Sequence, residues 1–201
     1  MLSPLTPATP EHLQLGCGVL LTNLDADGDA SPARLREAIA KALEDGHTLG
    51  VTRGGGRFVC KPALRQLDAD GLRAPRVGLM HCDGWTCRLT ATLLELSPAN
   101  LAMALACATR LTDRTTGRTT IIPRADLSDQ DFIPRLTWVG DTGSGLMMID
   151  MKNVLNLSGA ALTFNNRGEG ELPVELQPHL SRDDGPDVLP FHLCLLTEAD
   201  A

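Results

Sequence analysis

The sequence predicts a mainly β protein of the α+β class, an antiparallel β-sandwich or partial barrel flanked by one or two helices. Three observations predict it. Apolar and polar residues alternate in several separate segments, which is typical of strands with one buried face. Ser-Pro pairs open two helical patterns. The 201 residues, 43% of them hydrophobic, suffice for one substantial core. Strands with one polar face pair preferentially antiparallel.

The chain begins with a proline-rich segment and then a strand. Residues 1–12 contain Pro4, Pro7 and Pro10 and are expected to form an extended N-terminal arm. Residues 13–201 are expected to form a single domain. Its first strand follows from alternating positions, with Leu15, Cys17, Val19 and Leu21 on one face and Gly16, Gly18, Leu20 and Thr22 on the other.

Two helices are predicted by their caps and their apolar spacing. Ser31-Pro32 opens the first, over residues 32–45, and Gly46 ends it. Ser97-Pro98 opens the second in the same way. The expected buried positions are Leu35, Ala38, Ile39, Ala42 and Leu43 in the first helix, and Leu101, Ala104, Leu105 and Ala108 in the second.

Alternation predicts the remaining strands. The expected inward residues are Cys87, Leu89, Ala91 and Leu93; Leu136 and Trp138; Met147, Ile149 and Met151; Leu162 and Phe164; and Leu172, Val174, Leu176 and Leu180. A long loop is expected at about residues 51–76, with a hairpin around residues 67–71.

Composition restricts the function classes. There is no apolar run long enough for a membrane span and no secretory signal, so we expect a protein made in a cytoplasm, with its six cysteines as small, reduced, mostly buried side chains. The net charge of −7 is uneven: residues 126–201 hold 4 basic and 13 acidic side chains. An acidic segment repels polyanions, which disfavours tight nucleic-acid binding.

One motif suggests an enzyme. Asp141-Thr142-Gly143 follows an apolar strand, as the catalytic aspartate of an aspartic protease does. That mechanism needs two carboxylates sharing a proton, and no second Asp-Thr-Gly exists in the sequence. A five-residue hairpin turn over residues 141–145 is the simpler interpretation. A protease-like enzyme using Asp141 stays as an alternative.

Other motifs fail on spacing. Gly54-Gly55-Gly56 is not followed by the Gly-Lys-Ser/Thr and helix of a phosphate loop. The carboxylates of residues 25–29 have the wrong glycine position for a calcium loop. His81, Cys82 and Cys87 lack the spacing of a zinc site. We therefore expect no catalytic residue, no cofactor and no metal.

The order of motifs over residues 13–196 resembles the major tail tube protein of long-tailed bacteriophages and related contractile particles. The similarity starts with the glycine-rich stretch at residues 54–56, the Asp-Gly hairpin at residues 67–71, the alternating strand at residues 88–93 and the helix opened by Ser97-Pro98. Later strands at residues 136–140, 171–179 and 187–192 continue it. A helix before the glycine-rich stretch departs from the pattern.

The resemblance implies a structural virion protein without enzymatic activity. Six copies would form a ring, and stacked rings would form a hollow phage tail tube, assembled in the host bacterial cytoplasm, through which genomic DNA passes without specific binding. Its other partners would be tape-measure, terminator and baseplate or tip proteins, with no membrane. A tube of a contractile injection or secretion machine is an alternative implied by the same resemblance.

Two sets of residues are candidates for roles in such a tube. Ring-to-ring contacts are expected from the basic stretch and the hairpin, namely Arg53, Arg57, Phe58, Lys61, Arg65, Asp68, Asp70 and Gly71. An acidic lumen is expected from Asp141, Asp150, Glu171 and Glu175. The N-terminal arm is expected to bridge subunits.

Overall fold

The structure is a computed structural model and describes residues 6–24, 31–68, 70–71, 73–164, 166–185 and 187–197. Its strands are β1 (Gln14–Thr22), β2 (Thr52–Gln66), β3 (Met80–Leu93), β4 (Ala108–Thr112), β5 (Thr119–Pro123), β6 (Ile133–Thr142), β7 (Gly145–Asn156), β8 (Leu172–Gln177) and β9 (Phe191–Thr197). Its helices are α1 (Pro32–Glu44) and α2 (Pro98–Leu105), with 3-10 turns η1 (Thr9–His12) and η2 (Asp129–Asp131). The mainly β prediction with two helices is confirmed.

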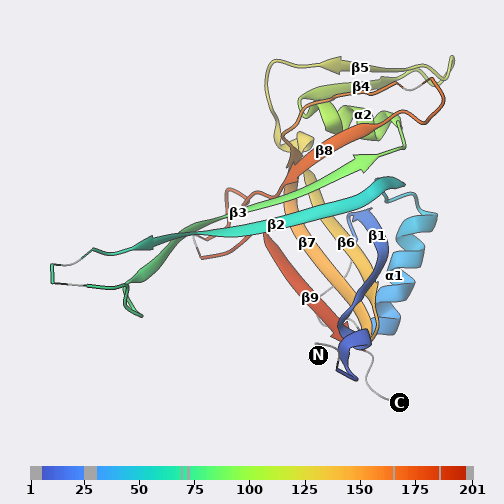
Figure 1. The fold of residues 1–201 in the computed structure, drawn as a ribbon. Helices are drawn as coiled ribbons and strands as arrows, with labels where there is room; N and C mark the ends of the chain where they lie inside the picture. Colours follow the sequence, from blue (N-terminus) through green and yellow to red (C-terminus); the bar gives the residue numbers. More distant parts are fainter. Residues whose placement is uncertain are drawn as a thin grey trace.

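A seven-stranded antiparallel sheet is bent around β7. The strand order is β1-β6-β7-β8-β3-β2, and β9 also pairs with β7 (Figure 1). The first half of β7, from Gly145 to Met151, pairs with β6 on one side and β9 on the other. Its last residues, Leu155 and Asn156, pair with β8. β7 therefore joins two half-sheets that enclose the larger core.

That larger core lies inside the bend. Buried side chains from β1, β3, β6, β7 and β8 meet there, together with Ala104 of α2. The four residues expected on the inner face of residues 87–93 are all buried, as the alternation predicted: Cys87, Leu89, Ala91 and Leu93. The small β4–β5 sheet lies beside α2, away from this core (Figure 1).

A second core lies under α1. Leu35 and Ala42 of the helix pack with Leu21, Val139 and Met148 of the sheet. Leu43, expected to be buried, is exposed at the edge of this contact. The sheet is thus covered on one face by a helix and on the other by its own second half.

Both helices begin as their sequences predict. The Ser31 hydroxyl accepts a hydrogen bond from the Arg34 amide, and the Ser97 hydroxyl accepts one from the Asn100 amide. The prediction for Ala108 was wrong: α2 ends at Leu105, and Ala108 opens β4. The residue between them, Ala106, has a φ of 60°, which interrupts the helix.

Most of the loop expected at residues 51–76 is strand. Thr52–Gln66 pairs with β3 from Gly56 onward, with one register shift between Ala63 and Leu64. Phe58, Cys60, Pro62 and Leu64 keep the alternation of a strand beyond the point where it leaves the body. Residues 67–79 connect the two strands. The two strands project from the body as a long hairpin (Figure 1).

Three further expectations were wrong in detail. The turn expected to take five residues is a tight one, because Thr142 pairs directly with Gly145. Residues 162–164 form no strand: Thr163 makes an isolated bridge to Glu171, and Phe164 is exposed. The first five residues of the expected N-terminal arm lie outside the described residues. The rest is not extended, since η1 occupies Thr9–His12 and packs by Pro10 against the turn at Gly143.

Substitutions at Gly16 and Gly18 would measure how tightly β1 packs on β6. Both glycines have positive φ, +79° at Gly16 and +69° at Gly18. A Cβ at Gly18 would lie 2.6 Å from the Trp138 ring and from the Val139 carbonyl oxygen. A Cβ at Gly16 would have none of the neighbouring atoms within 4 Å. Gly16→Ala should cost about 1–2 kcal/mol of backbone strain, and Gly18→Ala about 1–3 kcal/mol more from the clash. Urea unfolding of both variants measures the difference; equal costs would contradict this packing.

Candidate interaction surfaces

The projecting hairpin has one polar and one apolar face. It is defined here as residues 61–86, the part of β2 and β3 beyond the body together with the loop. Lys61 and Thr86 are directly opposite on one face, and Pro62 and Trp85 on the other. The apolar face consists of Pro62, Leu64, Met80 and Trp85.

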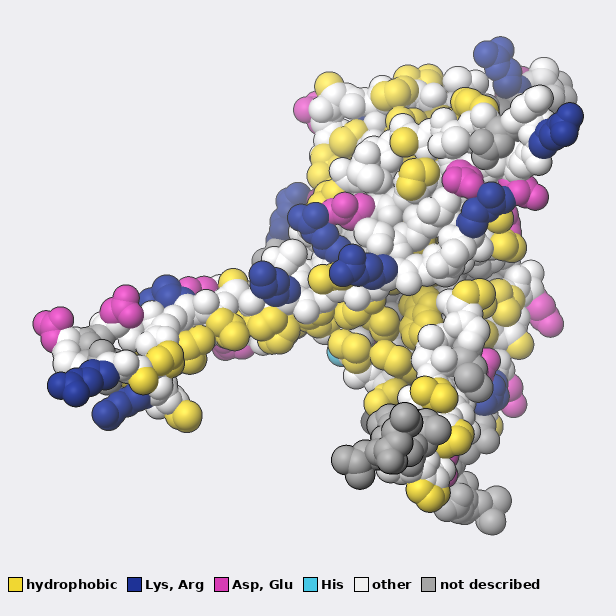
Figure 2. All heavy atoms as spheres, viewed as in Figure 1, with side chains coloured by type: hydrophobic (Ala, Val, Ile, Leu, Met, Phe, Trp, Pro, Cys, Tyr) yellow, Lys and Arg dark blue, Asp and Glu magenta, His cyan; other side chains and the backbone are white. Residues whose placement is uncertain are grey.

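This apolar face is largely uncovered within the protomer. Leu64 is 59% exposed, and Met80 and Trp85 are both 46% exposed. Only the root of the hairpin packs on the body, where the rings of Phe58 and Trp85 meet the Phe191 ring edge-on at 6.3 and 6.1 Å. Figure 2 shows hydrophobic atoms in a band along the hairpin that continues onto the body. An isolated two-stranded ribbon is marginally stable in water, so such a face is suited to a partner.

The hairpin is held in shape by an ion pair at a bulge. The register shifts between Ala63 and Leu64, and there Arg65 donates hydrogen bonds of 2.7 and 3.1 Å to the Asp83 carboxylate. The Arg65 hydrogen bonds lower the pKa of Asp83 below its ordinary value. Because both side chains are well exposed, the pair orients the strands more than it stabilises them.

The eight residues expected to form ring contacts are divided by the structure. Lys61, Arg65, Asp68, Asp70 and Gly71 belong to the projecting hairpin and are exposed. Arg53 is at the body end of β2, where it is paired with Glu169 and Glu171. Arg57 is exposed on the outer face of β2. Phe58 faces the interior of the protomer, toward Phe191, so the basic stretch is not one surface.

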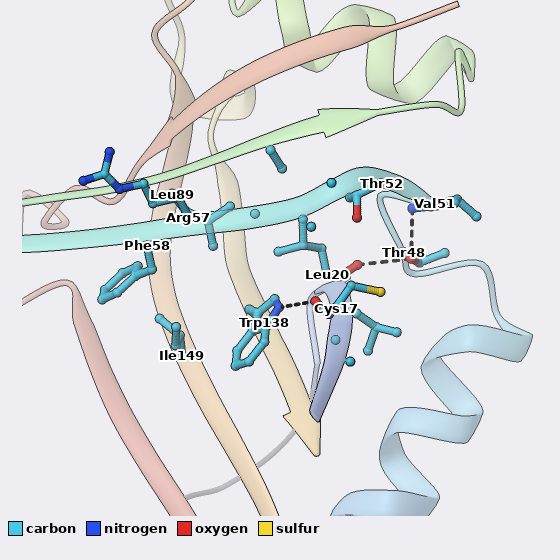
Figure 3. Close-up of a pocket in the computed structure, with 18 of the residues that line it drawn as sticks. Cys17, Leu20, Thr48, Val51, Thr52, Arg57, Phe58, Leu89, Trp138 and Ile149 are labelled. Carbon is cyan, nitrogen blue, oxygen red and sulfur yellow. Dashed lines mark hydrogen bonds between the residues drawn. The ribbon is translucent and has the colours of Figure 1, made fainter. Parts of the chain in front are cut away.

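An apolar groove separates β1 from β2. β1 pairs with residues 47–49 only at its end, where Leu49 donates to the Leu20 carbonyl at 3.1 Å. At Gly50, with φ +85°, the chain turns away, and the two strands diverge. The resulting groove has a volume of about 880 Å³. Leu20, Leu89, Trp138, Met147 and Ile149 are among the apolar residues that line it (Figure 3).

Glycines keep the groove open. Gly16 of β1 and Gly54 and Gly55 of β2 line its walls, and a Cβ at any of the three would meet no atom within 4 Å. Trp138 is fixed in the groove by a 3.1 Å hydrogen bond from its indole nitrogen to the Cys17 carbonyl (Figure 3). With an apolar lining and fixed polar groups, the groove is suited to binding apolar side chains.

In the seven-stranded sheet, three strands keep an edge that is unpaired along most of its length within the described part of the chain. β2 pairs only with β3, and β9 pairs only with β7, while β1 is paired on its second side only by the Leu21–Thr48 bridge. β9 carries Leu193 and Leu195, the latter 69% exposed. Natural monomers protect such edges with charge, proline or bulges, and β9 contains neither proline nor any side chain of Asp, Glu, Lys or Arg.

The four residues expected to form an acidic lumen each pair with an arginine, and because Asp150 is buried they do not form one exposed acidic surface. Asp141 lies 3.4 Å from Arg36, and Glu171 lies 2.9 Å from Arg53. Glu175 pairs with Arg88. The observed partner of Asp141 is therefore a guanidinium, whereas an aspartic protease needs a carboxylate that shares a proton with it.

Asp150 is buried, so its expected place on a lumen surface was wrong. It is 1% exposed, and its Oδ1 accepts hydrogen bonds of 2.7 Å from both Arg135 Nε and the Thr137 hydroxyl. Its Oδ2 lies 3.8 Å from His192 Nδ1. The alternation of β7 puts Asp150 on the face of the sheet that α1 covers. Alternation alone assigns residues to two faces and cannot tell a face covered by a helix from one exposed to solvent.

No group of three or more His, Cys, Asp or Glu side chains in the described residues is arranged to hold a metal ion. None of the helices described there is long and apolar enough to cross a membrane. No protein-family model matches the chain, and no curated protein sequence matches it significantly.

The burial of Asp150 makes a stability prediction. Asp150→Asn should lower the free energy of unfolding by about 3 kcal/mol, because it removes the buried carboxylate charge that Arg135 Nε contacts at 2.7 Å. Glu175→Gln removes the same charge from an exposed pair and should cost at most about 1 kcal/mol. Equilibrium denaturation of the two variants compares them; a cost for Asp150→Asn as small as that for Glu175→Gln would contradict a buried ion pair.

Proposed function

We propose that this chain is a structural subunit that assembles with copies of itself into stacked hexameric rings, forming the hollow tail tube of a bacteriophage. The observation that carries the proposal is the projecting hairpin, whose apolar face is largely uncovered in the described part of the protomer. A surface of this kind costs solubility unless a partner buries it.

The open sheet edges support ring formation. A sheet with different unpaired strands at its ends can join the next copy head to tail, and a closed ring removes every edge. β2 and β9 belong to different half-sheets and supply two such edges. The hairpin extends beyond the body, so it is free to reach a copy in the neighbouring ring.

The charge distribution is compatible with a conduit for DNA. The chain carries −7 overall, and its acidic residues 141, 171 and 175 are paired with arginines. Surfaces built from such pairs offer DNA no cluster of unpaired cations to bind, so DNA would slide past them. In the proposed virion the subunit would contact tape-measure, terminator and baseplate or tip proteins.

A tube in a contractile injection or secretion machine would use the same surfaces for a protein cargo. An enzymatic function has no comparable support, because the one catalytic motif has a guanidinium as its observed partner. Micrographs of the purified protein test the proposal directly. Rings or tubes are expected; a protein that stays monomeric at high concentration would contradict it.

The apolar face of the hairpin gives a sharper test. Leu64→Glu puts a charge on this face, and Thr86→Glu puts the same charge on the polar face of the same hairpin. Leu64→Glu should reduce assembly at least tenfold, since burying an unpaired carboxylate costs several kcal/mol. Thr86→Glu should assemble nearly as the wild type does. Sedimentation and negative-stain microscopy measure assembly, and circular dichroism checks folding; normal assembly of Leu64→Glu would refute this role.

A further inference from the structure

Two cysteines face each other where the hairpin leaves the body. Cys60 of β2 and Cys87 of β3 are directly opposite in the antiparallel register. Cys87 is buried in the larger core, and Cys60 is partly buried against it. Both are free thiols in this structure.

Their spacing is close to that of a disulfide. Directly opposite residues of an antiparallel pair have Cβ atoms about 4.5–5.5 Å apart, and a disulfide needs about 3.5–4.5 Å. A small approach of the strands closes the difference. The other cysteines in paired strands have no such partner: Cys82 is opposite Leu64, Cys194 is opposite Met148, and Cys17 lies where the register of β1 is interrupted.

We propose that Cys60 and Cys87 are a redox-sensitive pair, which a disulfide oxidant such as glutathione disulfide converts into an intrachain disulfide at the base of the projecting hairpin. This modification site concerns the single chain and is independent of the proposed assembly. In the reducing cytoplasm the pair would stay as thiols, and after exposure to an oxidising environment it would close.

The reaction proceeds by two thiol–disulfide exchanges. The Cys60 thiolate, the more accessible of the two, attacks glutathione disulfide and releases one glutathione thiolate. The Cys87 thiolate then attacks the Cys60 sulfur of the mixed disulfide and releases the second. The two protons lost by the cysteines are taken up by the two glutathione thiolates. Two protein thiols are oxidised, and one glutathione disulfide is reduced.

Burial makes this exchange slow at neutral pH. Burial, with a smaller contribution from the neighbouring Cys60 thiol, raises the pKa of Cys87 to about 12. Burial also raises the pKa of Cys60. Since the thiolate is the attacking species, these thiols resist brief oxidation and respond to sustained oxidation.

The disulfide would fix the root of the hairpin. It closes the chain over residues 60–87 and so constrains the separation of β2 and β3 in every state, folded or unfolded. Amide hydrogen exchange in the hairpin should slow as a result. The hairpin would then present its faces in one fixed orientation.

The experiment uses the full chain carrying Cys82→Ser, because Cys82 and Cys87 lie in the same tryptic peptide, residues 77–88. The protein is incubated with glutathione disulfide at mildly alkaline pH, quenched with acid and alkylated. Intact mass should fall by two hydrogens, and two thiols should escape alkylation. Digestion should link the peptide of residues 77–88 to that of residues 58–65.

Matched variants identify the pair. Adding Cys60→Ser or Cys87→Ser should abolish the linked peptide, whereas adding Cys17→Ser should leave it unchanged. The inference is overturned if Cys60 keeps a stable glutathione adduct and no link to Cys87 forms. It is equally overturned if the link joins two chains or a different pair of cysteines, as non-reducing electrophoresis and peptide mapping would reveal.

Discussion

The whole fold depends on β7 being paired along both halves of its length. Its first half completes a sheet with β6 and β9, and its end passes into the sheet of β8, β3 and β2. A strand with sheet on both sides and a layer on both faces must be apolar almost throughout. β7 meets this demand, with buried residues on both faces from Leu146 to Met151 and again at Val154 and Leu155. The one charge in the first run, Asp150, is paired with Arg135, and its Oδ1 accepts hydrogen bonds from Arg135 and Thr137.

The bend at β7 also determines which surfaces stay open. Because the two half-sheets turn toward each other, the outer strand β1 comes close to the segment before β2, where the Leu49 amide bonds to the Leu20 carbonyl. Beyond Gly50 the chain diverges from β1. The apolar groove is the space between them. The same bend directs β2 and β3 away from the body, so their outer halves have no second layer. The uncovered hairpin and the groove thus have one structural cause.

Local signals in the sequence were enough to predict these helices and strands, because each of them is specified by nearby residues. The Ser31 and Ser97 caps and the alternation from Cys87 to Leu93 predicted two helices and a strand that the structure contains. The bend and the shared pairing of β7 could not be predicted, because they depend on contacts between residues far apart in the chain. For the same reason, alternation in β7 showed that Asp150 lies on the other face of the strand from Met147 and Ile149, but it did not show that α1 covers that face. The apolar face of the hairpin could in principle be predicted from the sequence, because Pro62 and Leu64 continue the alternation of Phe58.

The edge of β9 constrains what the isolated protomer can be. Its residues Phe191–Thr197 include no Asp, Glu, Lys or Arg, and two leucines on one face are exposed. A protein selected to remain monomeric would place a lysine, a proline or a bulge there, as β2 does with Lys61, Pro62 and its irregular register. β9 has kept none of these protections, which is costly unless the edge is buried in use. The protected strand, β2, projects into solvent. The unprotected strand, β9, lies against the body, where another copy could dock on its edge. That asymmetry favours a chain whose finished form is an assembly.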